Sequence, residues 1–99
     1  MATKVRLTRQ ARDDLKDIGA YIGQDNPARA ATFIREIHVK AQAYADHPDM
    51  GRDRADLAPK IRSFPYGSYA VFYRHYRRGI QIVRVYHAGR DITPEVFVG

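Results

Sequence analysis

The dipeptide Asn26-Pro27 interrupts a continuous helical pattern and constrains the fold of this chain more than any other feature. Asparagine is a good N-cap, and proline suits the first position of a helix because its missing N–H would have no partner there. Apolar residues at helical spacing precede the break (Ala11, Leu15, Ile18 and Ile22) and follow it (Ala30, Phe33, Ile34, Ile37, Ala41, Tyr44 and Ala45). Thr8 is a suitable N-cap for the first helix. Two helices with so short a connection must run antiparallel, so we expect a helical hairpin that supplies half of the core.

Stretches rich in aromatic and β-branched residues flank this hairpin and predict strands. They are residues 4–7, 60–65, 68–76 and 80–87. The intervening segment 47–59 is rich in Pro, Gly and Asp and predicts a loop. Arg77-Arg78-Gly79 is expected to form a hairpin turn in which Gly79 is free to adopt a positive φ. The predicted fold is α+β in the order β-α-α-β-β-β, with a helical hairpin packed on a small, mostly antiparallel sheet.

The last predicted strand carries apolar residues on both of its faces. Strict alternation places Val83 and Val85 on one face and Ile80 and Ile82 on the other. A strand of this kind is covered on both sides. The helices can cover one face, and we expect either the C-terminal tail or a partner protein to cover the other. On the preceding strand, Phe72 is expected in the core.

Length and composition favour one small intracellular domain, spanning residues 1–99. The chain has no cysteine, which favours a reducing cytosol and excludes thiol catalysis. It has no apolar run of the length of a signal peptide or a membrane span, so we expect a cytoplasmic protein without a membrane partner. None of its four histidines has metal-ligand spacing, and we therefore expect no metal and no cofactor.

The charge of the chain points to a macromolecular partner. Seventeen Lys and Arg against 11 Asp and Glu give a net charge of +6, and arginine favours bidentate contacts with carboxylates or phosphates. A nucleic acid or an acidic protein segment fits this charge, and so does a merely soluble basic surface. The acidic residues Asp13, Asp14 and Asp17 are interpreted as helix-start charges rather than as acid–base catalysts. The loop at residues 51–56 holds Arg52, Arg54, Asp53 and Asp56, and it is either a docking loop or a local salt-bridge cluster.

Three stretches taken together resemble the ParE toxins of plasmid and chromosomal toxin–antitoxin pairs. They are VRLTRQARDDLKDIGAYIGQDNPARAATFI, HPDMGRDRADLAPKIRSFPYGSYAVFYR and IQIVRVYHAGRDI. The resemblance covers nearly the whole chain and implies a RelE/ParE-like fold. It also implies that the chain inhibits DNA gyrase and is held inactive by a ParD-like antitoxin whose acidic C-terminal segment folds along the toxin. The two chains would then form a hetero-oligomer that reaches DNA only through the antitoxin.

The sister branch of this superfamily, RelE, cleaves messenger RNA on the ribosome and provides an enzyme alternative. RelE-type toxins use a basic cluster and a C-terminal tyrosine, and Arg90 matches one of those arginines. A second RelE arginine falls here on Tyr69 or Ala70, and the tyrosine falls near Phe97, which has no hydroxyl. An RNase would have to recruit His75 or His87 as its acid or base.

We therefore expect a toxin that is not an enzyme and has no catalytic residues. The expected contacts with gyrase or the antitoxin lie at the sheet edge and in the tail: Arg62, Arg84, His87, Arg90, Glu95, Val96, Phe97 and Val98. The alternatives are the ribosome-dependent endoribonuclease and a non-toxic domain that retains only antitoxin binding and repression of its own operon.

Overall fold

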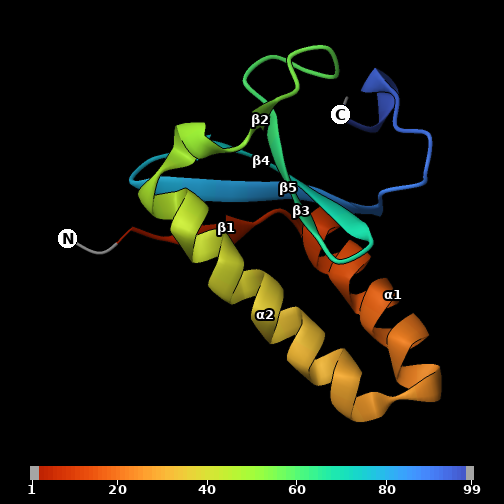
Figure 1. Ribbon diagram of the computed structural model, residues 1–99. Helices are drawn as coiled ribbons and strands as arrows, with labels where there is room; N and C mark the ends of the chain where they lie inside the picture. Colours follow the sequence, from red (N-terminus) through yellow and green to blue (C-terminus); the bar gives the residue numbers. More distant parts are fainter. Residues whose placement is uncertain (1–2, 98–99) are drawn as a thin grey trace.

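A computed structural model describes residues 3–97 of the chain (Figure 1). The elements are β1 (Val5–Leu7), α1 (Arg9–Asp25), α2 (Pro27–Asp46), η1 (Pro48–Met50), β2 (Arg52–Asp53), β3 (Arg62–Tyr66), β4 (Tyr69–Tyr76), β5 (Gly79–His87) and η2 (Pro94–Phe97). The predicted order is confirmed, with the short strand β2 and two 3-10 turns added inside segments expected to be irregular. Within the described residues, none of the helices is long and apolar enough to cross a membrane.

The two helices begin where their capping residues predicted. The Thr8 hydroxyl accepts a hydrogen bond from the N–H of Ala11 at 3.0 Å, and the Asn26 side chain accepts one from the N–H of Arg29 at 3.0 Å. Pro27 occupies the first turn of α2. These local bonds satisfy N–H groups that the helices leave open, so sequence alone sets both boundaries.

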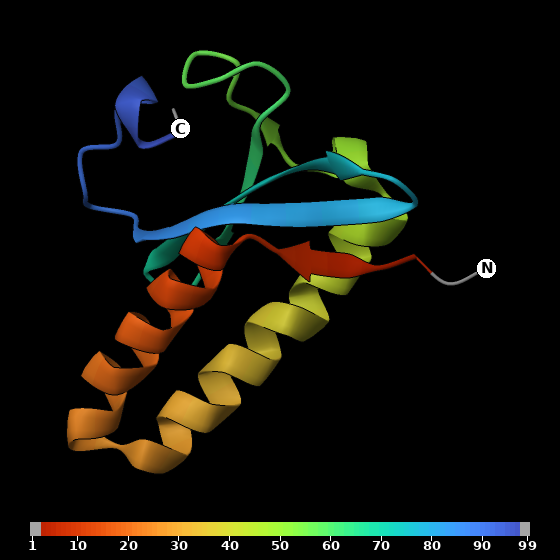
Figure 2. The ribbon, with the colours of Figure 1, turned by 180° about the vertical axis from the view of Figure 1, so that it is seen from behind.

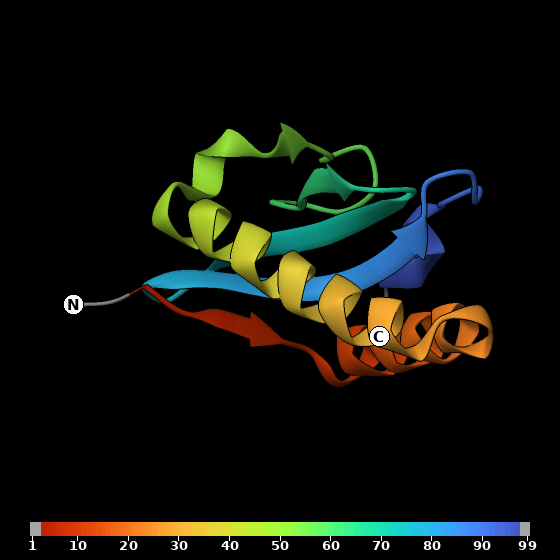
Figure 3. The ribbon, with the colours of Figure 1, turned by 60° about the horizontal axis from the view of Figure 1, so that its bottom comes forward.

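The five strands form one mixed sheet in the order β1-β5-β4-β3-β2. β1 pairs with β5 in parallel, and all other pairs are antiparallel. Both helices lie against one face of this sheet, and their hairpin end projects beyond it (Figures 1 and 3). The segment after β5 turns to the opposite face, as the view from behind shows (Figure 2).

The turn between β4 and β5 differs from the prediction in which residue adopts the positive φ. Arg77 has φ of 52°, whereas Gly79 is already the first residue of β5 and has no positive φ. Glycine is needed at position 79 for a different reason. A Cβ there would lie 1.9 Å from the carbonyl oxygen of Lys4, so only glycine lets β1 approach β5 this closely.

A bulge in β5 overturns the predicted alternation of its last residues. Phe72 pairs with Arg84 and the next residue, Tyr73, pairs with Ile82, so Val83 is the additional residue on β5. A single extra residue reverses which side chains point to which face from that position on. The prediction from strict alternation did not include this extra residue.

The bulge separates Val85 from Val83. Val85 lies with Ile80 and Ile82 in the core beneath the helices, whereas Val83 packs against the second cluster on the opposite face. The expected pairing of the two valines on one face is therefore wrong. The broader prediction, that β5 is covered on both faces, is confirmed.

Two apolar clusters lie on the two faces of the sheet. The helix side contains Ala11, Leu15, Phe33, Ile37, Ala41, Ala45, Phe64, Val71, Tyr73, Ile80, Ile82 and Val85. The opposite side contains Leu57, Ile61, Phe72 and Tyr86, with Ala58, Ala70, Val83, Ile92, Val96 and Phe97 packed around them. The C-terminal segment, one of the two expected covers, thus lies on the second face, and the loop before β3 also covers it.

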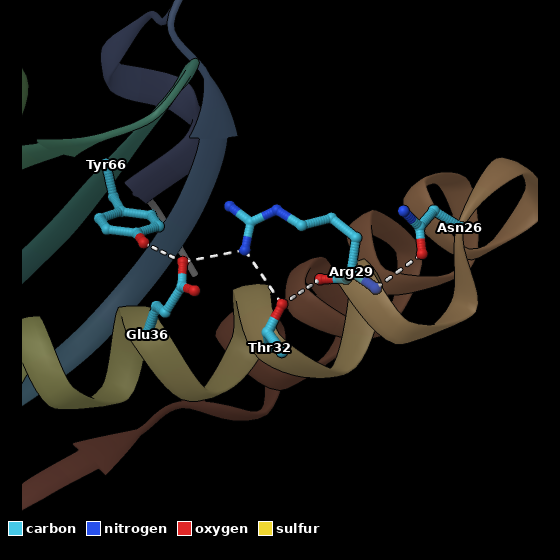
Figure 4. A network of polar contacts seen from close by, with 5 residues as sticks. All are labelled: Asn26, Arg29, Thr32, Glu36 and Tyr66. Carbon is cyan, nitrogen blue, oxygen red and sulfur yellow. Dashed lines mark hydrogen bonds and ion pairs between the residues drawn. The ribbon is translucent and has the colours of Figure 1, made fainter.

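A polar network fastens α2 to β3 (Figure 4). The Arg29 guanidinium donates to Glu36 at 2.9 Å and to the Thr32 hydroxyl at 3.1 Å, and the Tyr66 hydroxyl donates to the same Glu36 oxygen. The hydrogen bond from Tyr66, followed by that from Arg29, holds the pKa of Glu36 below its ordinary value. Together with the Asn26 cap, this network orders the exposed side of α2.

Candidate functional site

A groove of about 530 Å³ lies between the segment that carries β2 and the segment that follows β5; we call it the C-terminal groove. Its lining residues are Arg52, Arg54, Ser63, Phe64, Pro65, Gly67, Tyr69, Ala70, Phe72, His87, Ala88, Arg90, Asp91 and Ile92. The apolar floor belongs to β3 and β4, and the polar side chains come from the two flanking segments. Three arginines and one histidine against one aspartate make the lining cationic.

Arg90 is held in the groove by an aromatic ring. Its guanidinium lies over the ring of Tyr86 at 4.4 Å, and the guanidinium of Arg84 lies over the same ring at 4.6 Å. Tyr86 is buried, and burial raises the pKa of its hydroxyl. This arrangement brings two of the predicted contact residues together, from the last strand and the turn that follows it.

Arg84 itself is engaged inside the molecule. Its Nε and Nη2 donate to the two carboxylate oxygens of Asp14 at 2.8 and 2.9 Å, and the N–H of Val85 donates to Asp14 at 3.0 Å. The two side chains are only 18% and 13% exposed, and the bond to Asp14 raises the pKa of Arg84. Arg84 therefore joins α1 to β5. Of the two cations over the Tyr86 ring, Arg90 is the one exposed to solvent.

Asp14 is therefore not the helix-start charge that its position in the sequence suggested. The first turn of α1 holds no acidic residue, so the interpretation of these aspartates as partners of the helix dipole is wrong. Asp14 instead joins two elements 70 residues apart in the sequence.

His87 stands beside Arg90 at the rim of the groove and is exposed. Its Nδ1 accepts a hydrogen bond from the N–H of Gly89 at 3.1 Å, and its ring meets the edge of Tyr69 at 5.5 Å. The neutral ring therefore carries its proton on Nε2. The His87 imidazole is thus hydrogen-bonded to nearby backbone.

Arg62 lies apart from the C-terminal groove, in a separate hollow that His75 also lines. Its Nη1 donates to the carbonyls of Gly51 at 2.8 Å and Asp49 at 3.3 Å, and its Nε lies 3.8 Å from the Asp49 carboxylate. The structure thus gives Arg62 a role in holding the segment before β2. It also separates His75 from Arg90, leaving His87 as the histidine that shares the groove with Arg90.

Tyr73, on β4, is a core residue that supports the segment before β2. It is fully buried, donates to the carbonyl of Pro48 at 2.6 Å and accepts from the N–H of Gly51 at 2.9 Å. Burial raises the pKa of its hydroxyl. A Cβ on Gly51 would lie 2.2 Å from that hydroxyl, so this position requires glycine. The glycine is the sequence feature that could have indicated this contact. The pair anchors the segment that carries Arg52 into the groove.

The loop around β2 contains the local salt bridge that was one of the two alternatives for it. Arg54 forms a two-pronged ion pair with Asp56, with both distances 3.1 Å, and its guanidinium lies over Phe72 at 5.8 Å. The local salt bridge is therefore present. Arg52 and Arg54 also line the groove, which makes the docking interpretation compatible with it.

The C-terminal tail supplies one polar residue and two apolar ones. Glu95 is exposed, and a hydrogen bond from Thr93 holds its pKa below the ordinary value. Val96 and Phe97 pack on the second cluster, and the Phe97 ring meets Phe72 edge-on at 5.3 Å. Val98, the last predicted contact residue, lies outside the described residues.

Among residues 3–97, no group of three or more His, Cys, Asp or Glu side chains is placed to hold a metal ion. The arrangement is suited to binding an anionic surface through arginines beside apolar rings.

Comparisons with known proteins place the chain in a family. The profile of a family described as the ParE toxin of the type II toxin–antitoxin system, parDE, matches residues 5–92. The toxin ParE1 of Caulobacter vibrioides is 39% identical over 83 residues, which cover 83% of this chain and 85% of that toxin. A relative from Sinorhizobium fredii is 32% identical over 85 residues, covering 86% of this chain and 88% of the relative.

A solved structure supports the fold. The structure described as the chromosomal ParDE TA system from P. aeruginosa matches with a TM-score of 0.70, over 86% of this chain and 95% of that chain, at 20% identity. The family profile, the two relatives and the shared α+β fold lead to one conclusion: this chain belongs to the ParE toxin family of type II toxin–antitoxin systems.

Proposed function

We propose that this toxin inhibits DNA gyrase by binding it, performs no chemistry of its own, and is neutralised in the cytoplasm by a ParD-like antitoxin. The antitoxin would contribute an acidic C-terminal segment that orders on the toxin, which suits a toxin of net charge +6. Of the expected contact residues, His87 and Arg90 are exposed in the C-terminal groove. We propose these two, together with Arg52 and the tail, as the contacts with a macromolecular partner.

The observation that carries the proposal is the environment of Phe97 and Arg90. RNA cleavage at a 2′-hydroxyl needs a base, an acid and charge stabilisation at the phosphate. Phe97 stands near the position of the RelE tyrosine and packs edge-on against Phe72, where it can move no proton. Arg90 lies over Tyr86, and Tyr69 and Ala70 supply no second arginine. A binding surface is the function that these residues support best.

The RelE-like RNase is retained as a second candidate because His87 and Arg90 line one groove. This candidate predicts that His87→Ala and Arg90→Ala both abolish ribosome-dependent cleavage. The binding proposal predicts that neither the wild-type chain nor Phe97→Tyr cleaves messenger RNA on ribosomes, since the tyrosine alone leaves the position of the second RelE arginine, Tyr69 or Ala70, without a cation.

The direct test is a supercoiling assay with purified gyrase and relaxed plasmid. We expect the wild-type toxin to inhibit supercoiling and Arg90→Ala to weaken that inhibition about tenfold, as for a residue at an interface centre. Arg35→Ala, which removes an exposed arginine of α2 outside the groove lining, is the matched control and should inhibit like the wild type. Undiminished supercoiling at saturating toxin would refute the proposal.

A further inference from the structure

The C-terminal groove holds two arginines that form no ion pair within the described part of the protein. Arg52 and Arg90 are both exposed, and they come from its two opposite flanks. Arg54, which also lines the groove, is by contrast paired with Asp56. The lining adds the exposed carboxylate of Asp91. The groove therefore keeps a net positive charge after its internal pair is counted.

Arg90 is already oriented for a ligand. Its guanidinium lies over the buried Tyr86 ring at 4.4 Å, and the guanidinium of Arg84, which Asp14 holds through two bonds, lies over the same ring. A cation that rests on a fixed ring loses less side-chain freedom when it binds an anion than a free cation does. A planar guanidinium also matches the oxygens of a phosphate through paired N–H donors. Arg90 is therefore better suited to a phosphate than an unsupported surface arginine.

The floor of the groove is apolar and includes planar groups. Phe64 and Phe72 are each 1% exposed, and Tyr69 is half-buried. The Arg54 guanidinium lies over the Phe72 ring at 5.8 Å and is fixed by its two bonds to Asp56. Unpaired nucleic-acid bases stack on tyrosine rings and on guanidinium planes of this kind. The groove volume of about 530 Å³ lies in the range of sites that enclose a small molecule, and it can take a nucleotide.

Other occupants use this lining less completely. Duplex DNA keeps its bases stacked inside, so its phosphates could reach the arginines while the apolar floor stayed empty. An acidic peptide would pair with the arginines, but its carboxylate side chains carry no ring for the floor. A second cationic hollow of the described chain lies beside β1 and carries Lys4, Arg6 and Arg12, but its lining contains no Phe, Tyr or Trp. An unpaired nucleic-acid strand is the ligand that uses both the arginines and the floor of the C-terminal groove.

We propose that a single-stranded segment of DNA binds in the C-terminal groove, with its phosphates paired with Arg52 and Arg90 and a base stacked on the floor beside Tyr69. The choice of DNA over RNA rests on the proposed function, in which the toxin acts on gyrase, an enzyme whose substrate is DNA. The inhibited complex would then contain a direct contact between toxin and DNA. This contact is separate from any that the antitoxin makes.

Fluorescence anisotropy of a labelled oligonucleotide, titrated with the free toxin, measures this binding. We expect single-stranded DNA of about 12 nucleotides to bind with a dissociation constant of roughly 1–100 μM at physiological salt, as is usual for contacts without sequence preference. Two arginines that each neutralise one phosphate of a single strand give a slope of about −1.4 for log K against log salt concentration. A duplex of the same length should bind about fivefold more weakly or worse, because it leaves the floor unused.

Single substitutions separate the charge contacts from the stacking contact. Arg52→Ala and Arg90→Ala should each weaken binding about tenfold and flatten the salt slope by about 0.7. Tyr69→Leu should weaken it about tenfold with the slope unchanged, since it removes a ring and no charge. The matched control, Arg6→Ala, removes an exposed arginine from the hollow beside β1 and should change the affinity less than about twofold. Thermal melts establish that each variant is folded, and Arg90→Ala keeps the test decisive if Tyr69→Leu does not fold.

The outcomes separate this inference from the function on which it rests. Equal affinity of the wild-type, Arg90→Ala and Arg6→Ala proteins for single-stranded DNA would overturn the groove as a DNA site, and inhibition of gyrase by the same wild-type preparation would leave the proposed function standing. RNA of the same sequence binding more than about tenfold tighter than DNA would overturn the assignment to DNA.

Two further results concern a protein partner. Weaker binding of Arg90→Ala to gyrase or to the antitoxin, with unchanged affinity for the oligonucleotide, would assign the groove to that protein and overturn this inference. DNA binding that is lost in Arg90→Ala, from a wild-type toxin that does not inhibit gyrase, would support the groove as a DNA site and overturn the proposed function.

Discussion

Replacement of Asp14 by asparagine tests how α1 is fixed to the sheet. The carboxylate accepts two bonds from the Arg84 guanidinium and one from the N–H of Val85, and both charged side chains are largely buried. Asparagine keeps one accepting oxygen, turns an N–H₂ group toward the guanidinium, and leaves that cation uncompensated. Hydrogen bonds to charged groups contribute about 1.5–3 kcal/mol each to stability, so we expect a net loss of about 2–3 kcal/mol.

Asp13→Asn on the same helix is the matched control. Asp13 is exposed, so its replacement should change stability by less than about 0.5 kcal/mol. For a domain of this size, the expected loss in Asp14→Asn lowers the melting temperature by roughly 10–20 °C. Urea unfolding followed by far-UV circular dichroism measures both variants. Equal midpoints for Asp13→Asn and Asp14→Asn would refute the internal role of this ion pair and restore a simple helix-start charge.

Three further changes test the supports of the fold and groove. Tyr73→Phe removes the acceptor for the buried N–H of Gly51 and should cost about 1–3 kcal/mol in urea unfolding. Gly79→Ala forces β1 away from β5 at Lys4 and should cost about 1–3 kcal/mol, with faster amide exchange at the start of β5. Glu36→Gln should flatten the acid limb of the stability curve: the folded pKa of Glu36 lies below its unfolded value, so its contribution is present above about pH 5 and is lost as the pH falls through the folded pKa.

Each of these expectations has a contradicting result. Wild-type stability in Tyr73→Phe would mean that water replaces the hydroxyl. An unchanged melt for Gly79→Ala would mean that β1 is not held closely against β5. A Glu36→Gln variant with the same pH dependence as the wild type would assign the acid limb to other carboxylates.

The helical half of the fold was readable from sequence because its determinants are local. Thr8 and Asn26 bond N–H groups three residues away, and Pro27 is compatible with one position in a helix. The apolar stripes then fix which faces meet. Such signals do not depend on where the rest of the chain lies.

The sheet and the groove depended on contacts that sequence spacing does not encode. The bulge at Val83 arises where β5 pairs with β4, and it reversed the expected orientation of Val85. The bond between Tyr73 and Gly51 and the pairing of Asp14 with Arg84 join distant segments. Local sequence patterns could identify these residues but could not identify the distant residues that they contact.

The candidate site was only partly predictable for the same reason. His87 and Arg90 stood out because His87 ends the last strand and Arg90 follows it three residues later, and they do share a groove. Arg62 and Arg84 were expected to contact a partner at the sheet edge, but both bond groups inside the protein. Arg52 entered the groove through the short strand β2, which composition had indicated as loop.

The central claim is that this cationic body binds another macromolecule without acid–base chemistry. The most direct test is to induce the toxin in cells without its antitoxin and to measure plasmid supercoiling and the ends of ribosome-bound transcripts in the same culture. The account predicts loss of negative supercoiling with intact transcripts. Normal supercoiling together with new transcript ends, abolished by His87→Ala, would contradict it.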